Sequence, residues 1–180
     1  MCQVSDRGGI LIAIGANLPA ADGASPLLTC RRAAAALDAI PGMRLVALSR
    51  WWVSAPVPAS DQPDYVNGVA RLDGNVTPEA LLEALHALER RAGRRAAPNR
   101  NAARPLDLDI IALGRLVRRA PDPVVPHPRA HLRAFVLAPL AEVAPGWVHP
   151  ALGRTVEALL ADLRAQRLRA IENGDSPCGG

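Results

Sequence analysis

Asp107 and Asp109 alternate with apolar residues in the stretch Arg104–Ile110. This alternation has the period of a β-strand, which places both carboxylates on one face and the apolar side chains on the other. Two like charges this close on a strand repel each other, so a cation must compensate them. The cation could be a divalent ion such as Mg²⁺, which binds carboxylate and phosphate oxygens, or an arginine such as Arg104. A strand end with two solvated or salt-bridged aspartates would show the same local pattern.

Arginine takes the place of lysine throughout the chain, since all 21 lysine-plus-arginine positions are arginine. The absence of lysine excludes mechanisms that depend on a P-loop lysine, a protein-kinase lysine or a Schiff base. The arginine-rich segment Arg94–Arg104 runs directly into the acidic strand. This combination suits phosphoryl transfer, because metal ions bridge phosphates while guanidinium groups neutralise developing charge. Arginines at the end of a helix could equally form a solvated terminus that the helix dipole favours.

Other polar and aromatic residues could contact a ligand. His127 lies between two prolines, which restrict its backbone, and it is close in sequence to Arg133. It could contact a phosphate or lie in an ordinary surface turn. Tyr65 and Asn67 belong to an alternating stretch and therefore share a strand face. Their ring and amide could stack on a heterocycle and bind its edge, or they could form a cross-strand packing pair.

The composition is that of an ordinary globular protein, with 49% hydrophobic and 21% charged residues among 180. The net charge of +4 fits a polyanionic ligand, either a nucleotide or a nucleic acid. The cysteines are far apart and lack metal or redox spacing, so we expect free thiols in a reducing compartment. The apolar run Ile10–Ile14 is too short for a signal sequence, and no segment approaches a membrane span. We therefore expect a soluble, cytoplasmic protein.

The order of the expected elements predicts an α+β fold. They are a strand at 10–14, a helix at 25–40, strands at 44–53 and 65–72, a helix at 77–93 and a strand at 106–113. This βαββαβ order is the ferredoxin-like arrangement, an antiparallel sheet with helices packed on it. Additional C-terminal helices are expected at 129–143 and 155–167. We expect a single domain over residues 1–170 and a disordered polar tail over residues 171–180.

Several motifs together resemble one known family. They are Gly15-Ala16-Asn17-Leu18, Asp61-Gln62-Pro63-Asp64-Tyr65-Val66-Asn67, Arg104-Pro105-Leu106-Asp107-Leu108-Asp109-Ile110, Pro126-His127-Pro128 and Pro139-Leu140-Ala141-Glu142-Val143-Ala144-Pro145. In this order they are similar to motifs of 6-hydroxymethyl-7,8-dihydropterin pyrophosphokinase, over roughly Ile10 to Pro145. The family's ferredoxin-like fold agrees with the element order. The resemblance implies transfer of the β,γ-pyrophosphate of ATP to the pterin hydroxymethyl oxygen, with release of AMP, in folate biosynthesis.

The resemblance also implies roles for residues at matching positions. Asp107 and Asp109 would hold two Mg²⁺ ions between the protein and the triphosphate, while Arg94 and Arg104 would contact phosphates. The residues that would line the ATP site are Leu82, His86, Glu89, Ile110, Val124, His127 and Arg133. Those that would form the pterin pocket are Ser54, Ala55, Val57, Tyr65, Asn67 and Phe135. The rings of Tyr65 and Phe135, the only tyrosine and phenylalanine of the chain, would sandwich the pterin.

The segment before the acidic strand departs from the family's pattern. Many members have a second arginine at the position of Ala96, and a Trp-Gly pair where this chain has Asn101-Ala102-Ala103. Arg95 or Arg100 could replace the missing arginine. We expect this segment and the proline-rich loop 54–64 to close over the substrates, which would exclude water and suppress hydrolysis of ATP.

Two other functions fit parts of the sequence. A basic ferredoxin-like RNA-binding module would stack bases on several aromatic side chains, whereas the stretch 65–72 offers only Tyr65. RNA binding also gives no reason for two aspartates on what we expect to be the central strand. An inactive homologue that serves as an interaction module would be consistent with the altered arginine segment. We expect the enzyme, a monomer that acts on ATP and the pterin and binds neither nucleic acid nor membranes.

Overall fold

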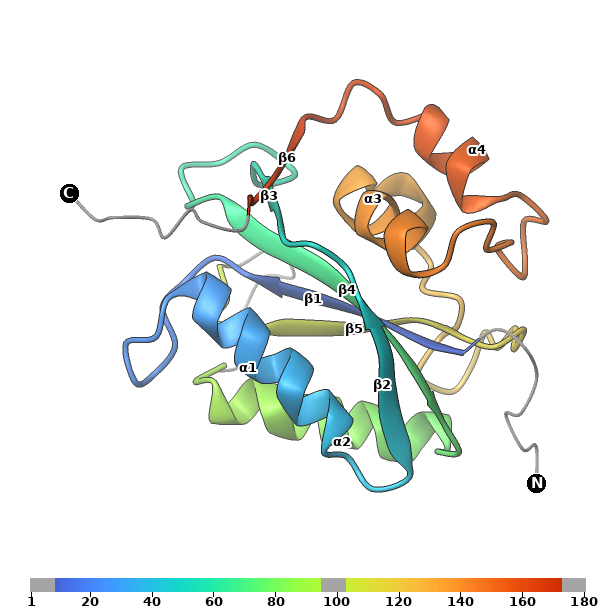
Figure 1. Ribbon diagram of the computed structural model, residues 1–180, viewed down its shortest axis with the longest axis horizontal. Helices are drawn as coiled ribbons and strands as arrows, with labels where there is room; N and C mark the ends of the chain where they lie inside the picture. The colour runs from blue at the N-terminus through green and yellow to red at the C-terminus, as the bar shows by residue number, and fades with distance from the viewer. Residues whose placement is uncertain (1–8, 95–102, 173–180) are drawn as a thin grey trace.

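An antiparallel sheet forms the middle layer of the molecule (Figure 1). The structure, a computed structural model, describes residues 9–94 and 103–172. Its strands are β1 (Ile10–Ala16), β2 (Met43–Leu48), β3 (Trp52–Ser54), β4 (Tyr65–Gly74), β5 (Asp107–Leu113) and β6 (Leu168–Ala170). Within the described residues they form one sheet in the order β5-β1-β4-β3-β6, with β2 paired to the second half of β4. The predicted ferredoxin-like α+β fold is confirmed.

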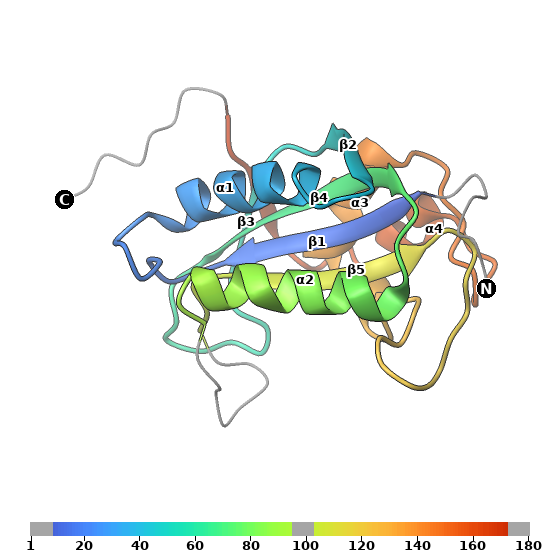
Figure 2. The same cartoon turned by 90° about the horizontal axis from the view of Figure 1, so that it is seen from below.

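Helices lie on both sides of this sheet (Figures 1 and 2). Two of them, α1 (Pro26–Asp38) and α2 (Pro78–Arg91), cover one face. On the other face α3 (Ala134–Val143) packs on β4, and α4 (Val156–Ala161) lies beside α3. The predicted starts of α1 and α2 are correct, because Ser25 and Thr77 accept hydrogen bonds from Leu28 N and Ala80 N and each is followed by a proline.

Alternation along β1 divides the core into two parts. Ile10, Ile12 and Ile14 are at most 2% exposed and belong to the cluster that α1 and α2 cover. Leu11 is fully buried in the second cluster, under α3 and α4. Burial on both faces makes β1 the most apolar strand of the sheet and fixes its register against both neighbours.

The register of β1 also determines which polar residues meet. Gly15 lies opposite Asn67 on β4 and opposite Asp107 on β5. Ala13, two residues earlier, lies opposite Asp109 on β5. Since opposite residues in antiparallel strands share a face, the amide and both carboxylates surround a strip of β1 that carries very small side chains.

The acidic strand lies at the edge of the sheet and not at its centre. Among the described residues β5 has a strand partner only on the β1 side. Helix α2 packs beside it. The expectation of a central position was wrong, because the last strand of a βαββαβ unit pairs with the first strand and remains outermost.

Two expected elements of the C-terminal part differ in extent. The expected helix 129–143 is interrupted at Arg133, whose extended backbone (φ −124°, ψ 106°) separates a 3₁₀ turn from α3. The expected helix 155–167 ends at Ala161, and the chain then forms β6 against β3. The expected strand 44–53 also divides, into β2 and β3.

Some expectations fall where the structure gives no description. The arginine segment from residue 95 to residue 102 lies outside the described residues, as do Cys2, Cys178 and the tail from residue 173 onward. Cys30 is a buried free thiol. No helix within residues 9–94 and 103–172 combines the length and the apolar character needed to cross a membrane.

Candidate active site

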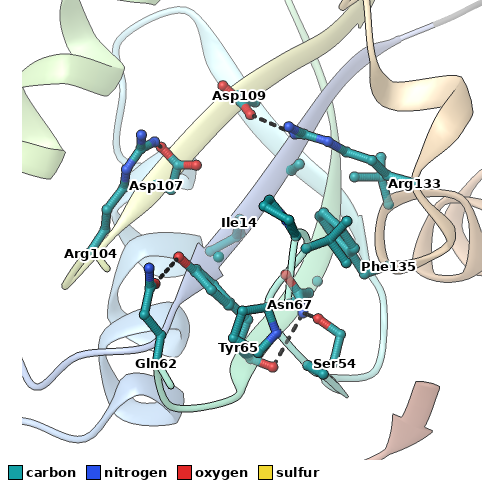
Figure 3. A pocket seen from close by; sticks show the side chains of 18 of the residues that line it. Ile14, Ser54, Gln62, Tyr65, Asn67, Arg104, Asp107, Asp109, Arg133 and Phe135 are labelled. Atoms are coloured by element: carbon teal, nitrogen blue, oxygen red, sulfur yellow. Dashed lines mark hydrogen bonds and ion pairs between the residues drawn. The ribbon is translucent and has the colours of Figure 1, made fainter. Parts of the chain in front are cut away.

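Asp107 and Asp109 both line a pocket on the α3 side of the sheet (Figure 3). The pocket has a volume of about 530 Å³ and is formed by β1, the starts of β4 and β5, the loop 54–62 and the start of α3. The apolar neighbours Leu108 and Ile110 point the other way and are 3% and 5% exposed. The predicted division of the strand into an acidic and an apolar face is therefore what the structure contains.

Asp107 is held by two guanidinium groups. Its Oδ1 accepts from Arg104 Nη1 at 2.6 Å and from Arg94 Nη1 at 3.0 Å. The Arg104 side chain is only 16% exposed, so this ion pair is shielded from water on most sides. The sequence left two possible partners for the acidic pair, a divalent ion and an arginine. In the described residues, arginines compensate the charge of Asp107.

Asp109 has more distant neighbours. His127 Nε2 and Arg133 Nη1 lie 3.7 Å and 3.9 Å from Asp109 Oδ2, beyond hydrogen-bond distance. Desolvation inside the pocket, followed by the charge of Asp107, raises the pKa of Asp109 above its usual value. Asp109 is thus the carboxylate of the pair whose charge is less well compensated.

His127 is oriented by the backbone that follows it. Arg129 N donates to His127 Nδ1 at 3.2 Å, which leaves Nε2 as the atom that faces Asp109. Burial lowers the pKa of His127, and the nearby charge of Asp109 acts in the opposite direction. The imidazole is therefore placed as a neutral donor beside the acidic strand.

The opposite end of the pocket is aromatic and polar. Tyr65 and Phe135 come from β4 and α3, and Figure 3 shows their rings on different sides of the pocket. Between them Asn67 is 5% exposed, and its Nδ2 donates to Ser54 Oγ at 3.0 Å and to the Tyr65 carbonyl at 3.3 Å. Because both donors of the amide are occupied, Asn67 offers its Oδ1 as a fixed acceptor.

The floor between the two ends is made of small residues. A Cβ at Gly15 would lie 3.6 Å from Asn67 Oδ1, with no other atom within 4 Å among the described residues. Ala13 also lines the pocket. Large side chains at these two positions of β1 would fill the space between the amide and the carboxylates, so the small residues keep the pocket open.

Asn17 and Gln62, for which the sequence predicts no role, connect the two ends of the pocket. Asn17 is 2% exposed, directly after β1. Its Oδ1 accepts from Arg104 N at 2.8 Å, and its Nδ2 donates to Gln62 Oε1 at 3.3 Å. Tyr65 Oη donates to the same Gln62 oxygen at 3.3 Å. Both residues belong to motifs that resemble the family, and this is the sequence signal that could have identified them. Their hydrogen-bond partners become visible only in the folded chain.

A sequence profile of the family described as 7,8-dihydro-6-hydroxymethylpterin-pyrophosphokinase matches residues 11–145. The chain belongs to this family. It is 42% identical over 152 residues to the 2-amino-4-hydroxy-6-hydroxymethyldihydropteridine pyrophosphokinase of Pseudomonas aeruginosa, a match that covers 84% of this chain and 90% of the relative. The protein of the same name from Synechocystis is 35% identical over 153 residues and is matched over 74% of its length. The resemblance inferred from the motifs is confirmed.

The fold is also that of solved pyrophosphokinase structures. The wild-type HPPK-DHPS protein of Plasmodium falciparum superposes with a TM-score of 0.62 at 10% sequence identity. That superposition covers 90% of this chain but 46% of the Plasmodium chain, so this chain spans about half the length of that structure. At such low identity the similarity shows the fold alone.

The residues predicted for a pterin pocket all line the pocket of this pyrophosphokinase-family chain. They are Ser54, Ala55, Val57, Tyr65, Asn67 and Phe135. Arg104 and Arg133 line it as well, beside the two aspartates. Arg94 is not part of the lining and reaches the site through its ion pair with Asp107.

The other residues predicted for an ATP site lie outside the pocket lining, toward α2 and the segment after β5. They are Leu82, His86, Glu89, Ile110, Val124 and His127. Ile110 is 5% exposed within the core, whereas His86 is exposed. Glu89 is 2% exposed, accepts from Leu108 N at 2.8 Å and pairs with Arg94. Burial raises the pKa of Glu89.

Proposed function

We propose that this chain transfers the β,γ-pyrophosphate of ATP to the hydroxymethyl oxygen of 6-hydroxymethyl-7,8-dihydropterin and releases AMP, a step of folate biosynthesis. One observation carries the proposal: an aromatic and amide end and a carboxylate and arginine end line the same pocket. A pterin held at the first end presents its hydroxymethyl group to a polyphosphate held at the second. Membership of the pyrophosphokinase family supports the same reaction.

The pterin ring lies between Tyr65 and Phe135 in this proposal, because aromatic faces stack well on a flat heterocycle. Asn67 selects the ring edge: its fixed Oδ1 accepts from the N–H groups of a pterin. Ser54 holds the Asn67 amide in that orientation, while Ala55 and Val57 close the loop side of the pocket.

Two Mg²⁺ ions would be held by Asp107 and Asp109 together with the triphosphate. The residues fit such ions, since both carboxylates are hard oxygen donors on one strand face, with side chains 26% and 38% exposed. Asp107 already accommodates positive charge from two arginines. When bound, the metal would neutralise charge on the transferred group.

Arg94 and Arg104 contact phosphate oxygens in the proposed complex, and they are placed to do so at the edge of the carboxylate pair. The nucleotide is bound by the residues along α2, β5 and the following segment, namely Leu82, His86, Glu89, Ile110, Val124, His127 and Arg133. A primary alcohol requires no strong base here, so the rate depends on alignment and on charge neutralisation.

The proposal includes a monomer that works in the cytoplasm on small molecules, without nucleic acid or a membrane. The cysteine spacing supports a reducing compartment. No observation on the described residues favours the RNA-binding module over the enzyme.

AMP formation from ATP and Mg²⁺ tests the proposed function. We expect AMP to form only when 6-hydroxymethyl-7,8-dihydropterin is present, in a one-to-one ratio with a pyrophosphorylated pterin detected by mass spectrometry. 6-Methyl-7,8-dihydropterin is the matched control, because it keeps the ring but lacks the accepting oxygen, and we expect no AMP with it. AMP that accumulates equally with either pterin, or ADP as the product, would contradict the proposal.

A further inference from the structure

Asn17 connects the two ends of the pocket through hydrogen bonds on both sides of its amide. Its main chain and side chain both pair with Arg104: Asn17 N donates to the Arg104 carbonyl at 3.0 Å, and Asn17 Oδ1 accepts from Arg104 N at 2.8 Å. The guanidinium of Arg104 in turn holds Asp107 at 2.6 Å. Asn17 therefore fixes the backbone of a residue that belongs to the phosphate end.

The other half of the Asn17 amide binds the loop that covers the pterin end. Asn17 Nδ2 donates to Gln62 Oε1 at 3.3 Å and to the Pro63 carbonyl at 3.2 Å. Gln62 Oε1 also accepts from Tyr65 Oη at 3.3 Å, and Figure 3 shows this pair beside the pocket. The chain of contacts from Arg104 to the Tyr65 ring thus passes through two side chains.

Asparagine suits this position because its amide accepts on one side and donates on the other. Aspartate would offer no donor to the Pro63 carbonyl, and an apolar residue would leave buried backbone and side-chain groups without partners. Asn17 is only 2% exposed, so water cannot easily replace these hydrogen bonds. The amide is therefore a rigid two-sided link between segments 45 residues or more apart in sequence.

We propose that Asn17 is a positioning residue that makes the binding of the pterin and of the nucleotide mutually dependent. This inference rests on the proposed function, since it needs both ligands to use the two ends of the pocket. A phosphate that draws the Arg104 side chain moves its backbone, and Asn17 carries that shift to Gln62 and Tyr65. By linkage, a pterin that orders Tyr65 favours the nucleotide-bound position of Arg104 by the same factor.

The test is the change in pterin affinity that a bound nucleotide causes, measured by calorimetry. The nucleotide is the Mg²⁺ complex of α,β-methylene-ATP, which cannot break at the bond to be cleaved. In the wild type we expect the analogue to tighten pterin binding by about tenfold or more, within the usual range of coupling between sites. In Asn17→Ala we expect the factor to fall to within about twofold, while each ligand alone loses less affinity than the coupling does.

Two further variants separate coupling from plain structural damage. Gln62→Met keeps the Asn17–Arg104 pair but removes the oxygen that Asn17 and Tyr65 share, so it should also abolish the coupling. The double variant should be no worse than Asn17→Ala, because the two side chains act in one chain of contacts. Asn75→Ala is the matched control, since Asn75 is exposed just beyond the far end of β4. It should couple the ligands as the wild type does.

Coupling that survives in Asn17→Ala would overturn the inference, and so would a wild type that binds the pterin equally well with and without the analogue. An equal loss of pterin affinity in both states would also overturn it, because that pattern belongs to a local structural role. If Asn17→Ala does not fold, retained coupling in Gln62→Met overturns it. The proposed function fails separately, when the wild type forms no pterin-dependent AMP.

Discussion

Asp107 and Asp109 are two residues apart on one strand, yet their surroundings differ. Asp107 binds two guanidinium groups, whereas the His127 imidazole and the Arg133 guanidinium lie 3.7 Å and 3.9 Å from Asp109. The pKa of Asp109 is raised by desolvation and by Asp107. The folded protein therefore holds a proton on Asp109 more tightly than the unfolded chain does. As the pH rises above 3.8, the ordinary pKa of an aspartate, ionisation of Asp109 lowers the free energy of unfolding.

Different stability changes with the same loss of activity are expected when either aspartate is replaced. Asp109→Asn should raise the melting temperature of the ligand-free protein at pH 7, because it removes a poorly compensated charge. Asp107→Asn should lower it, because Arg94 and Arg104 lose the carboxylate they share. Both should lower turnover by ~10²–10³, the usual cost of one preorganised electrostatic contact.

Melting curves and initial rates on both variants check this. Asp73→Asn is the matched control, since Asp73 pairs with Arg44 on the exposed surface. Near-normal turnover in either site variant would contradict the metal assignment. A melting temperature that collapses in both variants, together with the activity, would instead identify the pair as structural.

Tyr65 has two separable functions, its ring and its hydroxyl. Tyr65→Ala should weaken pterin binding by about tenfold, because stacking contributes about 1–1.5 kcal/mol beyond the buried area. Tyr65→Phe keeps the ring and loses only the bond to Gln62, so its affinity for the pterin alone should stay within about threefold. Calorimetry with each ligand separately measures both effects. Equal losses of nucleotide and pterin affinity in Tyr65→Ala would show that the ring is a packing residue.

At the scale of the elements, two glycines on adjacent strands have opposite requirements. Gly68 on β4 faces Trp51, and a Cβ there would lie 2.6 Å from Trp51 Cζ3. Gly15 on β1 has room for a Cβ, which would meet Asn67 Oδ1 at 3.6 Å. The first glycine allows the chain between β2 and β3 to pack closely on β4, while the second leaves space for a ligand.

Alanine at these two positions should therefore separate stability from binding. Gly68→Ala should destabilise the fold by about 1–3 kcal/mol through overpacking, which corresponds to a melting temperature lower by roughly 2–12 °C. Gly15→Ala should melt at or above the wild-type temperature, since alanine loses less backbone entropy than glycine, but it should weaken pterin binding. Thermal melting and pterin titration measure the pair. Full pterin affinity in Gly15→Ala would contradict the assignment of β1 as the pocket floor.

The sequence predicted the elements that periodicity and caps define, and missed those that depend on distant partners. Helices α1 and α2 follow from a capping residue, a proline and an apolar stripe. The three-residue strand β6 has no such local signal, because its pairing with β3 is a tertiary contact. The break at Arg133 is likewise accompanied by tertiary contacts, since Gln166 accepts from Ala134 N at 2.9 Å and donates to the Leu132 carbonyl at 3.1 Å.

The candidate site shows the same division. Asp107 and Tyr65 could be selected from strand alternation, and Phe135 from the resemblance to the family. The bonds of Asn17 to Arg104 and Gln62 could not, since their partners are 45 to 87 residues away. Residue types and spacing give the chemistry of single side chains, whereas the connections between them appear only in the folded chain.

At the scale of the whole molecule, the pocket lies where the ends of several elements meet. The last residues of β1 pair with the first residues of β4 and β5, and the start of α3 lies above them. One core lies between the sheet and α1 and α2, and the other lies between the sheet and α3 and α4. Tyr65 thus comes from the sheet and Phe135 from the helix packed on it, and both line the pocket.

The net charge is +4, and arginine is the only lysine-or-arginine residue type in the chain. This positive charge should make nucleotide binding more sensitive to salt than pterin binding. In the proposed complex ATP is a polyanion that contacts Arg94, Arg104 and Arg133, whereas the pterin is uncharged at neutral pH. Raising the salt from about 0.1 M to about 1 M shortens the Debye length from about 10 Å to about 3 Å, which screens the long-range attraction. Titrations of the Mg²⁺ complex of α,β-methylene-ATP and of the pterin at both concentrations compare the two. The nucleotide affinity should fall severalfold while the pterin affinity changes little. A parallel change in both would mean that salt acts on the fold, and that the positive charge of the molecule does not attract the nucleotide.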